Sequence, residues 1–239
     1  MQKLFVIGVY VDDLIVTGTS AREIRQFKQQ MMRELEMSDL GHLSYYLGIE
    51  VEQRNHCISL KQASYSKKIL ELAGMSDCNP TKCPMEPKLE LRKEEGGEPV
   101  NPTEYMRLIG SLRYLLHTRP DLAYVVGMVS RYMERPQSSY LQVVKQILRY
   151  VKGSINFGLC YTRGGDENLV GYSDSNLAGD VDDRKSTSGL AFYFCGNVIS
   201  WASQKQKSVA LSSCEAEFMA ATHSSSLPRH MAEGIVERT

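Results

Sequence analysis

The sequence predicts an α+β fold, and three observations carry the prediction. Two apolar, β-branched runs flank a pair of acids near the start of the chain, at residues 4–11 and 14–17. A middle segment, residues 105–152, has apolar residues at helical spacing. A later segment, residues 169–201, returns to short apolar runs separated by turn residues. Strands grouped toward both ends with helices between them are typical of an α+β fold.

The first two runs are expected to form a β-hairpin. Neither run alternates with polar residues, so both strands are expected to be largely buried. Asp12 and Asp13 separate them, and aspartate favours turns over strands. An ordinary Asp-Asp turn explains the pair without any function. Two crowded carboxylates are also the ligands that a hard cation such as Mg²⁺ prefers, and both interpretations stay open on the dipeptide alone.

Composition limits the class of protein only broadly. The 239 residues suggest one or two domains, and 28 basic residues balance 28 acidic ones, so net charge does not by itself indicate nucleic acid. Six scattered cysteines without a Cys-x-x-Cys pair make a zinc site or a disulfide framework unexpected. No signal peptide or long apolar span is visible, so we expect an intracellular location, cytoplasmic or nuclear, and no membrane partner.

The next elements follow from caps and periodicity. Ser20 and Glu23 form a capping box before a helix over residues 21–36, which is expected to pack behind the hairpin. A strand is predicted over residues 43–54, with a partner strand at residues 57–60. A short helix at residues 64–73 is expected to end at Gly74.

Residues 86–104 contain six acidic residues against three basic ones and are rich in turn formers. This composition predicts a solvated, mobile linker. Three helices are expected to follow it. Asn101 caps the first, with Pro102 at its first position; Pro120 begins the second, which ends at Pro136; and Ser138 or Ser139 begins the third, which ends at Gly153.

Residues 105–152 hold eight basic residues and two acids. Such an excess on helices is a candidate surface for phosphate groups, although solvated helix faces explain it equally well. The candidate nucleic-acid-binding residues are Arg113, Arg119, Arg131, Lys145, Arg149 and Lys152.

The last third predicts a strand at residues 169–176 and two strands, residues 190–194 and 198–201, joined across Gly196–Asn197. A helix is expected to begin at Ser212, with Glu215 as the capping partner. Asp174 taken alone is an ordinary acid at the end of a strand. The acids between these strands are expected to be solvated rather than to bind metal: Asp180, Asp182 and Asp183.

The tetrad Tyr10-Val11-Asp12-Asp13 between two apolar strands resembles the active-site hairpin of reverse transcriptases. Further blocks narrow the resemblance to the copia-type LTR retrotransposon polyprotein, up to about residue 222. These blocks are residues 40–51, residues 108–115 with Thr118-Arg119-Pro120-Asp121, residues 185–189, Ile199-Ser200-Trp201 and residues 210–218.

The resemblance implies a partial polymerase palm at residues 1–85, an acidic linker at 86–104, a helical thumb or connection at 105–163 and a truncated ribonuclease H-like domain at 164–222. It implies RNA-directed DNA synthesis and cleavage of RNA in hybrids, on an RNA/DNA template–primer and an RNA–DNA hybrid. Asp12 and Asp13 would be catalytic and bind Mg²⁺ or Mn²⁺ at the first site. Asp174 and Glu217 would do so at the second, because Glu217 fits the family's helix block better than Glu215 does.

Two departures from the family bear on activity. A further polymerase acid and the fingers subdomain would precede Asp12, and residues 223–239 depart from the family pattern, with Pro228 interrupting the helix. We therefore expect little or no activity from the chain alone, unless the parent polyprotein supplies the missing segments, and whether it is an enzyme stays open. The alternatives are a non-catalytic nucleic-acid-binding remnant acting through residues 105–152, and a chain that folds poorly.

Overall fold

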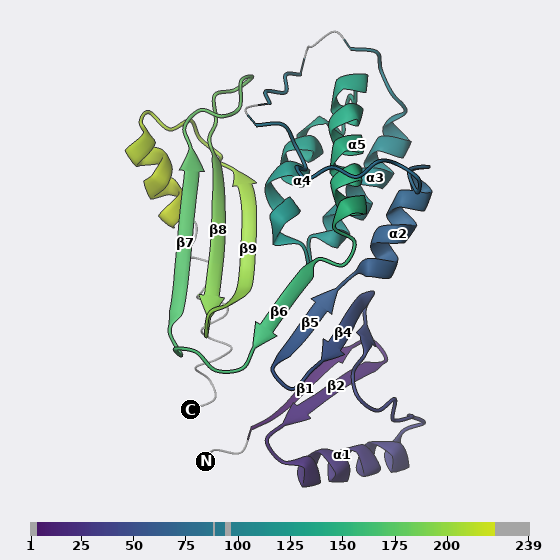
Figure 1. Ribbon diagram of the computed structural model, residues 1–239. Helices are drawn as coiled ribbons and strands as arrows, with labels where there is room; N and C mark the ends of the chain where they lie inside the picture. Colours follow the sequence, from purple (N-terminus) through teal and green to yellow (C-terminus); the bar gives the residue numbers. More distant parts are fainter. Residues whose placement is uncertain (1–3, 88, 94–96, 223–239) are drawn as a thin grey trace. The chain divides into compact units, whose positions relative to one another are not determined.

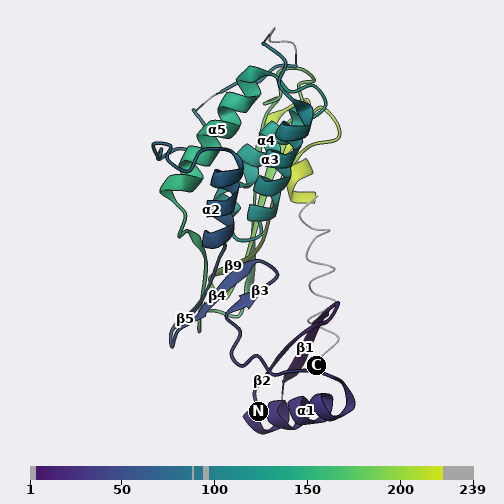
Figure 2. The same ribbon diagram turned by 90° about the vertical axis from the view of Figure 1, so that its right-hand side faces the viewer.

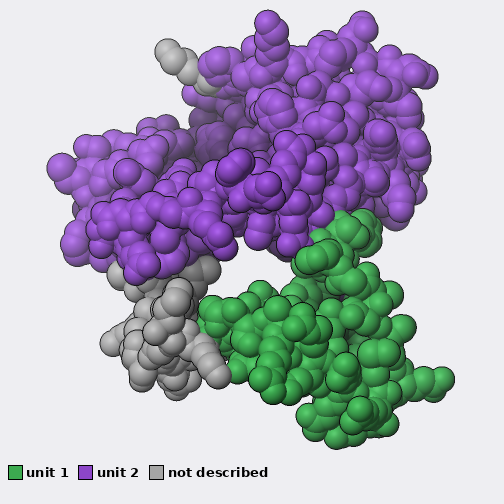
Figure 3. All heavy atoms as spheres, turned by 60° about the horizontal axis from the view of Figure 1, so that its bottom comes forward, with its two compact units in different colours: residues 1–46 green, residues 47–239 purple. Residues whose placement is uncertain are grey.

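The computed structural model describes residues 4–87, 89–93 and 97–222. It contains helices and sheets whose strands pair antiparallel, which confirms a mixed α and β architecture of the α+β kind (Figure 1). The chain divides into two compact units, Met1–Tyr46 and Leu47–Thr239, coloured separately in Figure 3. Residues 223–239, for which we expected a departure from the family pattern, lie outside the described part.

The first unit consists of strands β1 (Phe5–Tyr10) and β2 (Asp13–Gly18), helix α1 (Ala21–Glu34) and the short strand β3 (Tyr45–Tyr46). The Ser20 N-cap of the expected capping box is confirmed, because the backbone N–H of Glu23 donates to Ser20 Oγ at 3.3 Å. The rings of Phe5 and Phe27 pack edge to face, with centroids 5.4 Å apart, so α1 lies against the hairpin as expected.

The expected burial of the hairpin is wrong. The side chains of Val9 and Tyr10 are 68% and 54% exposed, and α1 has no buried residue. A two-stranded hairpin with one helix has too few neighbours to cover both of its faces. The apolar, β-branched composition of the two strands therefore reported strand propensity rather than burial.

The second unit begins with a break in the strand that we predicted over residues 43–54. Leu47 and Gly48 both have positive φ, of 47° and 76°, and the regular strand β4 (Ile49–Gln53) starts only after them. Gly48 is needed here for space as well as for φ. A Cβ atom on it would lie 2.5 Å from the hydroxyl oxygen of Tyr114, which donates a hydrogen bond to the carbonyl of Leu47.

A helical bundle forms the core of the second unit. It consists of helices α2 (Ala63–Leu72), α3 (Pro102–Leu115), α4 (Ala123–Val129) and α5 (Ser138–Gly153). Fully buried side chains from α3, α4 and α5 form one cluster: Ile109, Leu112, Val126, Ile147 and Leu148. None of the helices in the described part of the chain combines the length and apolar character that a membrane crossing requires.

The caps of the bundle follow the predictions closely. Asn101 Oδ1 accepts hydrogen bonds from the backbone N–H groups of Thr103 and Glu104, and Pro102 opens α3. The predicted second helix is instead divided. It starts and ends as 3₁₀ turns, Pro120–Leu122 and Ser130–Tyr132, on either side of α4.

Most of the described residues in the segment at 86–104 are exposed, and a few of them contact the bundle. Leu91 is buried in the core of the bundle. Tyr132 donates its hydroxyl to the carbonyl of Leu91 at 2.8 Å, and Tyr140 does the same to the carbonyl of Arg92. The backbone N–H of Lys93 donates to the Asp182 carboxylate. The buried Leu91 and two tyrosine donors far along the chain therefore hold residues 91–92 against the bundle.

Two antiparallel sheets complete the second unit. In the first, β5 (Cys57–Lys61) lies between β4 and β6 (Gly158–Thr162). The second has the order β7 (Leu169–Asn176), β8 (Thr187–Phe194) and β9 (Asn197–Lys205). Strand β6 was not predicted, whereas β7 has its predicted bounds. The β8–β9 turn lies at Cys195–Gly196, one residue earlier than expected, because both residues adopt the positive φ of a tight turn.

Helix α4 packs against β9, the edge strand of the second sheet (Figure 2). Residues 213–222 are helical and are held against the same sheet. The Gln206 amide nitrogen lies 3.1 Å from Ser175 Oγ, 3.0 Å from Ser188 Oγ and 2.9 Å from the carbonyl oxygen of Ala216. A single buried amide therefore joins β7, β8 and the helix.

Candidate functional site

The turn between β1 and β2 carries the first pair of candidate acids. Tyr10 pairs with Asp13, so the two-residue turn consists of Val11 and Asp12 rather than Asp12 and Asp13 as predicted. Asp13 is the first residue of β2. Val11 has a φ of 52°, a left-handed conformation that is rare for a β-branched side chain. A two-residue hairpin turn requires positive φ at a central position, and here valine supplies it at a cost in strain.

The carboxylates of Asp12 and Asp13 are exposed, and within the described residues no hydrogen bond or ion pair engages either of them. The strained turn therefore holds two adjacent carboxylates open to solvent. Backbone strain of this kind is concentrated at functional sites, where surrounding structure holds an unfavourable conformation in place. Carboxylate oxygens are suitable donors for Mg²⁺ or Mn²⁺.

The second pair of acids comes from β7 and the helix at residues 213–222. Asp174 is exposed and pairs in register with Gly189. Glu217 Oε1 accepts a hydrogen bond from the backbone N–H of Ser175 at 3.2 Å, so its carboxylate is fixed beside the residue that follows Asp174. Glu215 instead serves the helix start, as expected. Its Oε2 accepts from the Leu211 N–H at 2.7 Å, and its own N–H donates to Ser212 Oγ.

Within the described residues, no group of three or more Asp, Glu, His or Cys side chains is arranged to hold a metal ion. The first candidate site offers two adjacent carboxylates, and at the second Glu217 is held at Ser175, the residue after Asp174. Such a pair has the donor chemistry that Mg²⁺ requires and leaves the other positions of an octahedral ion to water or substrate phosphate oxygens. The residues present therefore fit a magnesium ion in donor type.

The loop between β7 and β8 contains an ion-pair centre that the sequence did not reveal. Asp180 was expected to be solvated but is 4% exposed. Its Oδ2 lies 2.6 Å from Lys205 Nζ on β9 and 3.2 Å from Arg131 Nη1 on the bundle. Its Oδ1 accepts from the backbone N–H groups of Asp182 and Asp183. These contacts tie the bundle to the sheet through one carboxylate.

The pKa of Asp180 reflects this environment. Burial alone would raise it, but the hydrogen bond from Lys205, the backbone N–H of Asp183 and the positive charge of Lys205 outweigh burial and lower the pKa to about 2. Asp180 is therefore ionised throughout the physiological range, with a structural function.

Two arginines of the predicted basic surface form contacts within the chain and are therefore not free to bind phosphate groups. Arg119 is buried, and its guanidinium bonds to both carboxylate oxygens of Asp121 and to Ser154. Arg131 bonds to Asp180 and to Thr187 Oγ1. A count of charges along the sequence could not separate these arginines from exposed ones. It does not show that Arg119 is buried with Asp121, or that Arg131 meets Asp180 in a distant loop.

Of the remaining candidate nucleic-acid-binding residues, two contact carbonyl groups of the chain and two are exposed. Lys152 donates to the carbonyl of Ser76 at 2.6 Å, and Arg149 donates through Nε to the carbonyl of Asn79 at 2.8 Å, so both anchor α5 to a nearby turn. Arg113 on α3 and Lys145 on α5 are exposed. These two cations are the candidates best placed to meet a phosphate group.

Comparison with known proteins assigns the family. The model of the reverse transcriptase (RNA-dependent DNA polymerase) family matches residues 1–87. The chain is 38% identical to the retrovirus-related Pol polyprotein from transposon RE1 of Arabidopsis thaliana and 38% identical to that from transposon TNT 1-94 of Nicotiana tabacum, over 91% and 92% of its length. It is 35% identical to the mitochondrial protein AtMg00810 of Arabidopsis thaliana, over 89% of this chain and 88% of that protein.

The chain belongs to the reverse transcriptase family of copia-type retrotransposon Pol polyproteins. The hairpin with Asp12 and Asp13 lies inside the segment that matches the reverse transcriptase model, whereas Asp174 and Glu217 lie outside it. The chain spans 15% and 17% of the RE1 and TNT 1-94 polyproteins, about one sixth of their length. No solved structure matches it.

Proposed function

We propose that this chain takes part in RNA-directed DNA synthesis, with Asp12 and Asp13 as metal-binding carboxylates of the nucleotidyl-transfer site. The observation that carries the proposal is the strained turn at Val11, which holds two adjacent carboxylates exposed in a chain of the reverse transcriptase family. The family name alone does not select residues. The turn supports Asp12 and Asp13, because it presents two carboxylates that no other described residue engages.

In this proposal the hairpin binds and orients the metal-bearing nucleotide. A bound Mg²⁺ would neutralise charge on the attacking and leaving oxygens of a phosphoryl transfer. The pairing of Tyr10 with Asp13 in the β1–β2 ladder places Asp13 at the start of β2, next to Asp12 in the turn. Because each carboxylate pair supplies only part of a two-metal ligand set, synthesis by the chain alone is expected to be weak.

The parts of the chain receive functions by the same proposal. Residues 1–85 would belong to the polymerase palm, residues 105–163 to the helical thumb or connection, and residues 164–222 to a ribonuclease H-like domain, with residues 86–104 joining the first two. Support for the last comes from Glu217, whose carboxylate accepts a hydrogen bond from the backbone N–H of Ser175, the residue that follows Asp174. The substrates would be an RNA/DNA template–primer and an RNA–DNA hybrid.

The test begins with metal binding, because that readout does not require activity. Mn²⁺ in place of Mg²⁺ should broaden the NMR signals of the backbone amides around the Val11 turn at low metal concentration. Asp12→Asn combined with Asp13→Asn should remove the broadening, whereas Asp77→Asn, at an exposed acid in a different turn, should leave it unchanged. If the double variant broadens like the parent chain, the hairpin is not the metal site.

Primer extension on an RNA template then tests the activity itself. Synthesis in Mg²⁺ should fall to background in the double variant and persist in Asp77→Asn. Equal extension by the double variant and the parent chain would contradict the assignment of Asp12 and Asp13 to nucleotidyl transfer.

A second candidate function is binding of nucleic acid without catalysis. The exposed cations Arg113 and Lys145 favour it. Binding to a hybrid duplex should then weaken steeply with salt, because each phosphate contact releases a counterion. A steep salt dependence combined with no extension and no hybrid cleavage would favour this function over the first.

A further inference from the structure

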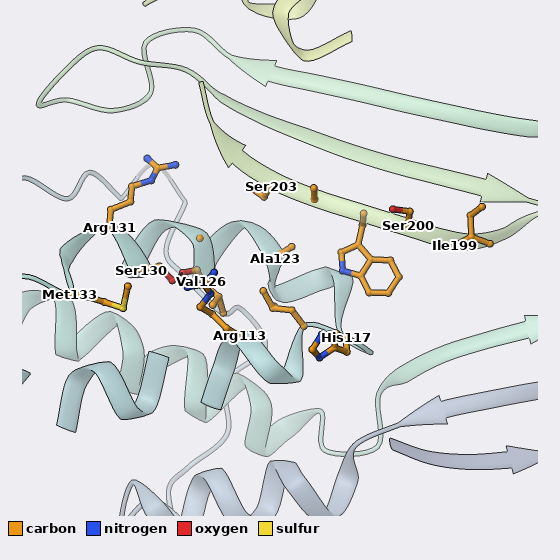
Figure 4. Close-up of a pocket in the computed structure, with 14 residues that line it drawn as sticks. Arg113, His117, Ala123, Val126, Ser130, Arg131, Met133, Ile199, Ser200 and Ser203 are labelled. Carbon is orange, nitrogen blue, oxygen red and sulfur yellow. Dashed lines mark hydrogen bonds between the residues drawn. The ribbon is translucent and has the colours of Figure 1, made fainter. Parts of the chain in front are cut away.

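A pocket of about 610 Å³ lies in the second unit, between the helical bundle and strand β9. In Figure 4, Arg113 and His117 lie on the helical side, and Ile199, Ser200 and Ser203 lie along the strand on the other. The volume falls in the range of pockets that bind organic ligands, about 300–1,000 Å³. The predicted catalytic acids are not part of it: none of Asp12, Asp13, Asp174 and Glu217 lines the pocket.

The charge of this pocket is one-sided. Arg113, His117 and Arg131 line it, and among the described residues that line it there is no aspartate or glutamate. Arg131 is already held by Asp180 and Thr187. Two nitrogen-bearing side chains therefore remain for a ligand, and an anion is the ligand that such a wall attracts.

His117 is oriented for this purpose. Its Nδ1 lies 2.8 Å from the carbonyl oxygen of Tyr114, and since a carbonyl can only accept, Nδ1 carries the proton. This contact leaves Nε2 as the ring nitrogen that can meet a ligand; Nε2 donates to a phosphate oxygen only when it too carries a proton, and otherwise accepts from a donor. The edge-to-face packing of the His117 and Tyr114 rings, with centroids 5.2 Å apart, fixes the plane of the imidazole.

The opposite wall is aromatic and hydroxylated. Trp201, on β9, is the one tryptophan of the sequence and is half-buried in the pocket lining. Ile199 lies on the same strand, and Ser200 and Ser203 add hydroxyl groups that can donate or accept. An indole offers a flat face for an aromatic ring, and proteins that bind single-stranded nucleic acid stack bases on such side chains.

We propose that this pocket binds a nucleotide unit of a single-stranded nucleic acid, with the phosphate at Arg113 and His117 and the unpaired base stacked on Trp201. The inference rests on the proposed function, which supplies a nucleic-acid substrate, and it adds a binding site whose lining includes none of the proposed catalytic carboxylates. A base within a duplex is paired and stacked and cannot lie on an indole, so the ligand is single-stranded. A free nucleotide shares this chemistry and is distinguished by the test.

Trp201 is itself the probe, because no other tryptophan contributes fluorescence. A short oligothymidylate titrated into the full chain should quench the tryptophan emission to saturation. Arg113→Gln should weaken the binding about tenfold and lower the slope of log K against log salt by about 0.7, the value for one phosphate contact on a single strand. His117→Gln should also weaken binding. Arg107→Gln, on another face of the same helix α3, is the matched control and should leave binding within about twofold.

Thymidine 5′-monophosphate forms the second arm of the experiment. Much weaker quenching by the mononucleotide than by the oligonucleotide assigns the pocket to a strand, whereas equal affinities assign it to a free nucleotide. Absence of quenching by both overturns the proposal, and so does equal binding by Arg113→Gln, His117→Gln and the parent chain. Asp12→Asn combined with Asp13→Asn should bind the oligonucleotide normally, so failure of the pocket and failure of the catalytic assignment are separable.

Discussion

Lys205 Nζ lies 2.6 Å from the Asp180 carboxylate, which joins the end of β9 to the loop that follows β7. Arg131 binds the same carboxylate from the bundle, so this acid bonds to two cations from separate elements. Loss of a partner from a buried ion pair is usually more costly than loss of a surface pair, because the remaining charges stay away from water.

Neutralising Asp180 should therefore destabilise the second unit. Asp180→Asn is expected to lower its free energy of unfolding by about 2–3 kcal/mol, below the full penalty because Lys205 keeps Asp183 at 2.8 Å. Trp201 fluorescence during urea denaturation provides the measurement. Asp77→Asn, at an exposed acid, should change stability by less than about 0.5 kcal/mol. Equal unfolding midpoints for the two variants would contradict a structural function of Asp180.

The same carboxylate makes stability depend on acid. Its pKa is lowered from 3.8 to about 2, so the folded state binds its proton less readily than the unfolded chain does. The stabilisation is complete above about pH 4 and is lost as the pH falls toward 2, in total about 2 kcal/mol. When the parent chain is denatured at pH values between 5 and 2, its free energy of unfolding should fall by this amount, in addition to the losses that other acidic residues cause. Asp180→Asn should lack this part of the pH dependence, and parallel pH profiles for the two proteins would count against it.

Replacing two arginines of the bundle should have different effects on stability. Arg119→Ala should cost about 3 kcal/mol of stability, because it removes charge-assisted hydrogen bonds to Asp121 and Ser154 and leaves a cavity. Arg113→Gln, at an exposed position, should change stability by less than about 0.5 kcal/mol. Denaturant unfolding measures both effects. A stable Arg119→Ala protein would show that its buried contacts contribute little.

Two glycine replacements test the unexpected strand β6. A Cβ atom on Gly158 would lie 2.1 Å from the carbonyl oxygen of Leu60, so Gly158→Ala should force β6 away from β5 and cost about 1–3 kcal/mol. Gly110, in the middle of α3, has no atom within 4 Å of the equivalent position, and Gly110→Ala should stabilise by about 0.5–1 kcal/mol. The two thermal midpoints should move in opposite directions. A shift in the same direction for both would be evidence against the β5–β6 pairing.

The elements predicted well from the sequence are those with a local signal. The Ser20 and Asn101 caps and the short apolar run that opens β7 depend on residues a few positions apart. Strand β6 was missed because five residues beginning with glycine resemble a loop, and its identity as a strand comes from β5. Burial of the hairpin was overestimated for the same reason, since burial depends on neighbours that a local pattern does not contain.

The same distinction between local signals and distant neighbours applies to the candidate sites. The four acids could be named from short motifs, and the turn at Val11 and the contact between Glu217 and Ser175 were then added by the structure. The functions of Arg119 and Asp180 could not be predicted, because a charge count does not show which charges are buried together. The pocket could not be predicted either, because Arg113 and Trp201 are far apart in the sequence.

Strand β6 also has a consequence for the order of folding. Its partner β5 ends at Lys61 and β6 begins at Gly158, so the whole helical bundle is the loop that their pairing must close. Closing a loop of disordered chain of that length is entropically unfavourable, whereas a folded bundle brings the two ends together in advance. During synthesis on the ribosome, β5 therefore has no β6 to pair with until the helical bundle has folded.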